Sequence, residues 1–436
     1  MAYTKIEHTD HPSYMTRNNS WAGLKKSLGP GLLMAGAAIG VSHLVQATRA
    51  GADYGFLLIW AVLLANLFKY PFLEFGPRYA VSAGESLIEG YNRLGSWALA
   101  LFTLFTLSTM FAIHAAVTVV TASLAAELTG LPLGSFFWSA MILLLCCSLL
   151  FSGRYSILDG AMKFIMAVLA LSTLAALFFA LVGGDFTHLE QIEPPPVWTL
   201  GGVAFLIALM GWMPIPIDVA AWHSIWTLER EKQTGYRPTI RQSSTDFNIG
   251  YIGASLLAFA FLILGATVMY GTGEKFASSG AVFAGQLIHL YTSHLGEWAY
   301  PIIIIAAFTT MFSTTFTVTD AYPRVCSKLL LIFRPDLLST GFTARKLYRM
   351  LLFSISAASL TFLYLMGDRF VVLIDIATTL SFLTAPVLAW MNYRLVHLPN
   401  VPESDRPPSW LRWLAIGGIL FLTIFALVYL GWMIFI

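Results

Sequence analysis

Charged residues are scarce in this 436-residue chain. Asp, Glu, Lys and Arg make up only 11% of it, whereas 57% of the residues are hydrophobic and 14% are aromatic. Soluble globular proteins carry about a quarter charged residues. The composition therefore excludes a large soluble protein and indicates a polytopic membrane protein.

The chain contains few cysteines and no sequence motif typical of an enzyme. Cys146 and Cys147 are adjacent, Cys326 stands alone in a basic segment, and no spacing resembles a zinc site. The sequence shows no nucleophile–base pair, phosphate-binding loop or basic nucleic-acid-binding run. We therefore expect neither an enzyme nor a nucleic-acid partner, and no cofactor.

Long apolar runs are abundant. A window of about 20 residues predicts eleven transmembrane helices. They lie near 29–51, 55–80, 96–127, 133–151, 157–183, 199–226, 246–271, 298–327, 348–366, 370–396 and 411–436. We expect a cytoplasmic segment at 1–28, a core of ten spans at 29–399, and a linker with the eleventh span at 400–436.

The positive residues between the spans set the expected orientation. Of the 25 Lys and Arg residues, 21 fall in segments on the N-terminal side, three on the opposite side and one, Lys69, within a span. Positive residues concentrate on the cytoplasmic side of membrane proteins. This distribution predicts a multi-pass plasma-membrane protein with a cytoplasmic N-terminus and an extracytoplasmic C-terminus.

Two of the predicted spans are interrupted. The first contains Gly36 and Gly40, followed by a polar run, and the sixth contains Pro214 and Pro216. Glycine weakens a helix, and the two prolines remove backbone donors and clash with the preceding turn. Paired broken helices at corresponding positions of two halves indicate an inverted-repeat secondary transporter with its site near the bilayer midplane.

Several motifs now resemble a known family, the Nramp metal-ion transporters. The segments that carry the resemblance are the opening GPG, TRAGADYGFLLIWAVLLANLF, GPRYAVSAGESLIEGY, GRYSILDG, Met213-Pro214 and FSTTFTVTDAYPRV. The resemblance runs in register from about Gly29 to about Pro399. It implies an all-α LeuT-type fold with a 5+5 inverted repeat, alternating access, and proton-coupled import of manganese or iron.

The chain departs from the family pattern at the expected site. The family has Asp-Pro-Gly-Asn in the first break, with Asp and Asn as metal ligands, and this chain has Gly40, Val41, Ser42 and His43. In the sixth span Met213 matches the family's thioether ligand, and Met210 takes the place of its carbonyl ligand. Ile215 replaces a family histidine. The resemblance thus makes Gly40, His43, Met210 and Met213 substrate-binding candidates.

Four further residues complete the expected site. Asp375 lies about where the family places a Gln that can join the metal shell, and His114 aligns with an acidic residue that helps carry protons. Asp218 follows the sixth break and Gln46 lies towards the outer mouth, so we assign both to coupling or gating. Purely structural roles also stay open: His114 could form a hydrogen bond to a neighbouring helix, and Asp218 could cap a helix.

Two functions remain open. In the first, the chain moves a divalent metal ion through an altered site, with His43, Met213 and Asp375 as metal ligands. A +2 ion in a low-dielectric site needs compensating charge, however, and the family's first-span carboxylate is absent. In the second, the same scaffold moves a small anion or polar solute.

Overall fold

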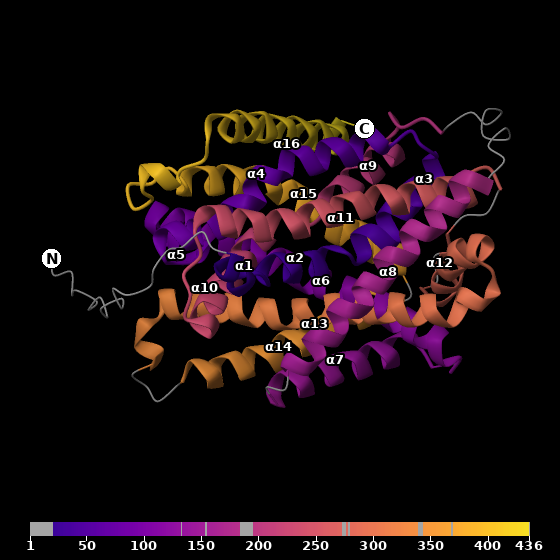
Figure 1. Cartoon of the computed structure of the whole chain (residues 1–436), viewed down its shortest axis with the longest axis horizontal. Helices are drawn as coiled ribbons and strands as arrows, with labels where there is room; N and C mark the ends of the chain where they lie inside the picture. Colours follow the sequence, from indigo (N-terminus) through magenta and orange to yellow (C-terminus); the bar gives the residue numbers. More distant parts are fainter. Residues whose placement is uncertain are drawn as a thin grey trace.

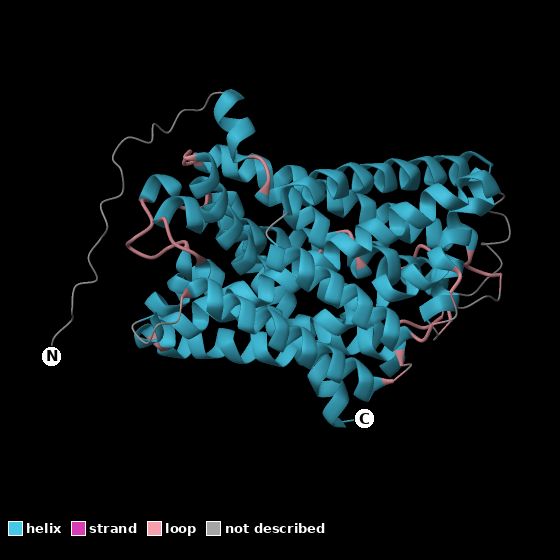
Figure 2. Ribbon diagram, turned by 90° about the horizontal axis from the view of Figure 1, so that it is seen from below, coloured by secondary structure: helices cyan, strands magenta, loops and turns pink. Residues whose placement is uncertain are grey.

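The structure is a computed structural model that describes residues 21–131, 133–152, 155–183, 195–272, 276–277, 280–338, 343–367 and 369–435. Every regular element in these ranges is helical, as Figure 2 shows. Most of the helices run along the longest axis of the molecule (Figure 1). This agrees with the eleven transmembrane helices predicted from the sequence.

Each of the eleven predicted spans coincides with a helix or a broken pair of helices. The continuous ones are α4 (Ile59–Ala83), α6 (Ser96–Thr129), α7 (Ser135–Ser152), α8 (Tyr155–Gly183), α11 (Ile240–Val268), α13 (Tyr300–Phe333), α14 (Ala344–Met366), α15 (Phe370–Leu395) and α16 (Ser409–Phe435).

By length and composition alone, seven helices of the described residues could cross a bilayer, and a bent pair makes an eighth. The helix α4, which carries Lys69, Glu74 and Arg78, is not among those seven.

The first span is broken as predicted. It consists of α2 (Pro30–Ala38), a π-helical segment (Ser42–Ala47) and α3 (Thr48–Tyr54), and its two parts are bent by 42° at the break. π-Helical turns are rare and are frequently found at functional sites. The bend therefore separates two half-helices at Ile39–Val41.

The sixth span is broken as well. The helix α9 (Leu200–Trp212) ends before Met213, and α10 (Val219–Thr234) begins after Asp218. Figure 1 shows α10 towards the end of the molecule that carries the N-terminus, and α9 towards the opposite end. The non-helical stretch between them holds both prolines.

Shorter helices join the spans. They are α1 (Trp21–Ser27), α5 (Leu87–Leu94), α12 (Gly280–Leu295) and three 3₁₀ turns at Glu297–Ala299, Pro335–Leu338 and Glu403–Asp405. The helices α5 and α12 were not predicted. A capping box starts α5, because Ser86 and Glu89 each accept a hydrogen bond from the other's backbone N–H. This Ser-x-x-Glu pattern in the sequence is typical of a helix start.

The helix α11 packs closely along both halves of the first span. Glycines make this approach possible: a Cβ on Gly31 would meet the backbone of Asp246, and one on Gly51 would meet the backbone of Leu262. Small residues at helix interfaces let backbones come together in membranes. The two halves of the first span are thus held against one continuous helix.

Candidate functional site

The first break is closed by a neighbouring helix. The Thr314 hydroxyl, on α13, donates to the carbonyl oxygen of Gly36 at 2.9 Å. A Cβ on Gly40 would come within 2.8 Å of Thr314 Oγ1. Gly40 is therefore a position of close packing, and a larger residue there requires Thr314 to move.

His43 lies at this break but faces α11. Its ring is completely buried, with Nε2 2.8 Å from the carbonyl oxygen of Ala254 and Nδ1 2.7 Å from Ser42 Oγ. A carbonyl can only accept, so Nε2 carries the proton. Nδ1 lies within hydrogen-bond distance of Ser42 Oγ, whose single proton can go either to Nδ1 or to the carbonyl oxygen of Ala38. Both ring nitrogens therefore have protein partners in this state.

Ser42 connects the two breaks. Its Oγ lies 2.6 Å from the carbonyl oxygen of Ala38 and 3.2 Å from that of Pro214. Sequence reasoning noted Ser42 only as part of a polar run. The structure places it where the broken first and sixth spans touch.

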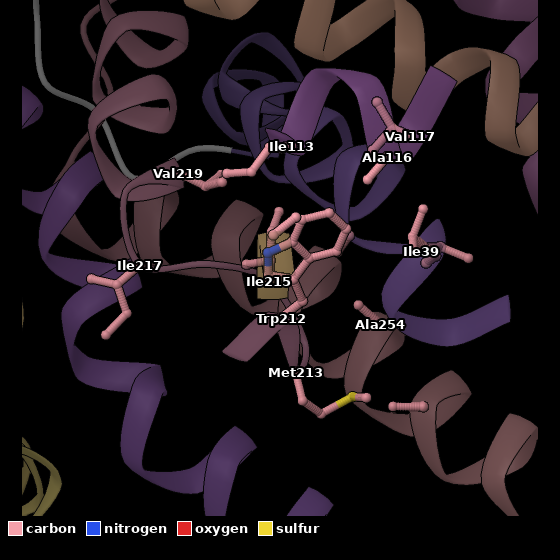
Figure 3. Packing of buried hydrophobic residues seen from close by; sticks show 14 of the residues in the cluster. Ile39, Ile113, Ala116, Val117, Trp212, Met213, Ile215, Ile217, Val219 and Ala254 are labelled. Atoms are coloured by element: carbon pink, nitrogen blue, oxygen red, sulfur yellow. The ribbon is translucent and has the colours of Figure 1, made fainter. Parts of the chain in front are cut away.

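Apolar side chains surround the sixth break. Figure 3 shows Ile39, Met213, Ile215 and Ala254 close to the non-helical stretch. Met213 is fully buried, and its backbone N–H donates to the carbonyl oxygen of Met210 at 3.4 Å. The Met213 side chain is therefore part of the buried hydrophobic cluster.

Lys69 is the residue that sequence reasoning missed. Its ammonium, on α4, donates to the carbonyl oxygens of Gly211 at 2.7 Å and Ile215 at 3.3 Å. The exposed fraction of Lys69 is 0%. Asp218 interacts with it electrostatically. The sixth break thus already contains a cation and a carboxylate.

A polar cluster ties α3 to α15. Asp375 accepts from Arg49 at 2.8 Å and from Gln46 at 3.1 Å, and Gln46 also reaches Thr378 Oγ1 at 3.3 Å. The Arg49 guanidinium lies 5.0 Å from the centre of the Phe205 ring on α9. The structure therefore brings Gln46 and Asp375 together, with an arginine that neutralises the carboxylate.

His114 lies apart from the breaks. Its Nε2 is 2.8 Å from Thr319 Oγ1 on α13, and its Nδ1 is 3.0 Å from Ser359 Oγ on α14. It links three helices of the bundle. Asp218, by contrast, lies directly before α10 but makes no side-chain capping hydrogen bond to it.

Two of the expected metal ligands have protein partners: His43 contacts the carbonyl oxygen of Ala254, and Asp375 accepts from Arg49. Within the described part of the chain, no group of three or more His, Cys, Asp or Glu side chains could hold a metal ion. An open apolar groove of about 600 Å³ runs along α2, α8 and α11, and its wall includes Ile39 and Ala254 together with the exposed Leu174 and Leu256.

One protein family matches nearly the whole chain. The family described as natural resistance-associated macrophage protein-like matches residues 31–432. The chain belongs to the Nramp family. It is 34% identical over 428 residues to the uncharacterized protein PM0681 of Pasteurella multocida, with 95% of each chain covered. It is 25% identical to metal transporter Nramp2 of Populus trichocarpa, over 66% of this chain and 53% of that protein.

Solved structures of the Nramp family show the same fold. A manganese transporter of Eremococcus coleocola, crystallised with an aromatic bis-isothiourea substituted compound, matches with a TM-score of 0.67 at 14% identity. The match covers 97% of this chain and 90% of that one. The predicted LeuT-type architecture with a broken first helix is confirmed. This Nramp protein is thus a multi-pass membrane transporter and not an enzyme.

Proposed function

We propose that this Nramp-family protein is a secondary active transporter whose cargo is a small organic solute without positive charge. Its two broken spans meet at Ser42 and Pro214, and they supply the elements that alternating access needs. The observation that carries the proposal is the charge balance at the breaks. Asp375 forms an ion pair with Arg49, and Asp218 interacts electrostatically with Lys69.

The charge balance disfavours a divalent ion. A +2 charge leaving water for a membrane interior loses solvation that only nearby negative charge can offset. Asp375 forms an ion pair with Arg49, and Asp218 interacts with Lys69. A metal ion at the breaks would have to displace one of these cations first.

The remaining groups suit an uncharged or anionic cargo. His43 offers no free nitrogen, and Met213 and Ile215 of the sixth break belong to the buried hydrophobic cluster. The Lys and Arg distribution supports a plasma-membrane protein with its N-terminus in the cytoplasm and its C-terminus outside.

A divalent metal ion is the second candidate. Met213 beside the sixth break favours it, because thioether sulfur binds soft transition metals. The names of the plant and bacterial relatives point the same way. In this case His43, Met213, the Met210 carbonyl and Asp375 would form the shell, and Asp375 would leave Arg49. His114 would then be a candidate for proton coupling.

Calorimetry separates the two candidates. The purified protein is titrated with Mn²⁺, Cd²⁺ and Mg²⁺, and we expect no binding heat at about 1 mM of any ion, where binding energies are already weak. Binding in the micromolar range that Met213→Leu abolishes would establish the metal instead. Met391→Leu is the control, because Met391 is equally buried but lies in α15.

A thermal-stability screen then seeks the cargo. Solutes that bind the folded protein raise its melting temperature. We expect members of an uncharged or anionic panel to do so, and radiolabelled forms of those solutes to accumulate in proteoliposomes. A screen in which metal ions alone stabilise the protein would contradict the proposal.

A further inference from the structure

We propose that Lys69 is a tethered cation that occupies the carbonyl-lined break of the sixth span and thereby excludes mobile cations from it. This inference rests on the proposed function, because it names the residue that sets the charge selectivity of the transporter. It concerns a side chain on α4, which is neither broken nor part of the first or sixth span.

The position of the ammonium carries the inference. Gly211 lies in the last turn of α9, and Ile215 lies in the non-helical stretch that follows. The last carbonyls of a helix lack partners within it and lie at the negative end of its dipole. Lys69 Nζ donates to both residues, at 2.7 Å and 3.3 Å.

The burial of Lys69 excludes an ordinary snorkelled role. Lys69 lies near the middle of the 25-residue helix α4, and its exposed fraction is 0%. A snorkelled lysine would keep its ammonium in water or at the lipid headgroups. A charge held inside the membrane protein instead is costly and is usually functional.

The surrounding charges complete a cation site. Asp218 acts electrostatically on Lys69, and it also acts on Tyr91 of α5 and Tyr322 of α13. On α4 itself, Glu74 is held by Arg78 at 2.8 Å. The helix α9 contains no titratable side chain. Asp218 is therefore the carboxylate that acts electrostatically on the ammonium.

The same oxygen atoms would suit a mobile cation. Backbone carbonyls and carboxylates are the ligands that hard cations use, and unwound helix ends coordinate the ions of many transporters. With Lys69 in place, an entering cation meets a like charge and carbonyls that already accept hydrogen bonds. Removal of the ammonium should therefore turn the break into a cation site.

The test compares the full-length purified wild type with three variants of Lys69. Lys69→Arg keeps the charge, Lys69→Gln keeps hydrogen-bond donors without charge, and Lys69→Met keeps neither. The melting temperature of each protein is first measured in choline chloride. It is measured again after choline is replaced by sodium, and separately after Mn²⁺ is added, always at equal ionic strength. Lys328→Gln is the control, because Lys328 pairs with Glu89 elsewhere.

We expect Lys69→Gln and Lys69→Met to gain about 3 °C or more with sodium or Mn²⁺, as a bound ion stabilises the folded state. The wild type, Lys69→Arg and Lys328→Gln should show no such gain. Adding Asp218→Asn to Lys69→Gln should remove it.

The inference is wrong if Lys69→Gln and Lys69→Met do not respond to either cation, or if both fail to fold in every salt. Either result would show that a mobile cation does not replace the ammonium. Micromolar Mn²⁺ binding by the wild type would instead overturn the proposed function. The two failures are therefore distinguishable.

Discussion

At the scale of single residues, Gly40 is restricted to glycine by one neighbour. A Cβ there would lie 2.8 Å from Thr314 Oγ1 and 2.9 Å from Thr314 Cγ2. We expect Gly40→Ala to lower the free energy of unfolding by about 1–3 kcal/mol, the usual cost of overpacking. Thr314→Ala should relieve most of this cost, as a double-mutant cycle by chemical denaturation measures.

Gly253→Ala is the control for this cycle. It lies within the helix α11, and a Cβ there would meet nothing within 4 Å. Alanine is favoured over glycine inside helices by about 1 kcal/mol, so this variant should be neutral or stabilising. A Gly40→Ala protein as stable as Gly253→Ala would contradict the predicted clash. The same clash implies that Gly40→Asp alone builds no metal site.

The sequence predicts which residues lie at the breaks better than it predicts their partners. Gly40, His43 and Met213 lie where the glycines and prolines place them. The roles of Lys69 and His43 depend instead on carbonyl oxygens of Gly211 and Ala254, far away in the chain. Backbone acceptors have no residue-type signature, so spacing alone could not reveal these contacts.

At the scale of elements, the first half-helix depends on a carboxylate from another helix. Asp246 of α11 accepts from the backbone N–H groups of Gly29 at 2.9 Å and Gly31 at 2.6 Å, at the start of α2. A carboxylate here satisfies free donors and favours the positive end of the helix dipole. We expect Asp246→Asn to accelerate amide exchange in residues 29–36 about tenfold, or roughly 1.4 kcal/mol.

Asp320→Asn serves as the control for this prediction. Asp320 pairs with Arg324 at 2.6 Å on α13, so its loss also removes a carboxylate from the protein. Hydrogen exchange followed by mass spectrometry should show residues 29–36 unchanged in this variant. Equal exchange rates in Asp246→Asn and the wild type would mean that Asp246 does not hold α2.

Spans and breaks are the elements that sequence predicts well. Apolar length defines α6, α11 and α13, and two prolines interrupt the sixth span for a local reason. The helix α12 was missed because it is only 16 residues long and joins two spans. The π-helical segment Ser42–Ala47 was missed because its register follows from tertiary contacts such as His43 with Ala254.

At the scale of the whole molecule, polar contacts hold both ends of the first span against other helices. Asp246 holds the start of α2 against α11, and Asp375 holds Arg49 of α3 against α15. Arg230 of α10 also donates to the carbonyl oxygen of Lys26 in α1, at 2.9 Å. Alternating access requires one of these ends to open at a time. Loss of the Asp246 contacts should therefore favour opening at the α2 end, and loss of the Arg49–Asp375 pair should favour opening at the α3 end.

Loss of the Arg49–Asp375 tie should favour opening on the α3 side. Arg49 and Asp375 are 11% and 37% exposed, so the pair contributes about 1 kcal/mol or less, and the open population should rise up to about fivefold. Thr378→Cys reports on this opening, because Thr378 is buried beneath the pair and the native cysteines are buried too. In proteoliposomes, Arg49→Gln should accelerate labelling of the introduced cysteine by a membrane-impermeant thiol reagent in proportion. Asp246→Asn should leave that labelling unchanged or slow it, because this variant loosens the opposite end of the first span. If Arg49→Gln labels no faster than the Thr378→Cys protein alone, the Arg49–Asp375 pair does not hold the α3 side closed.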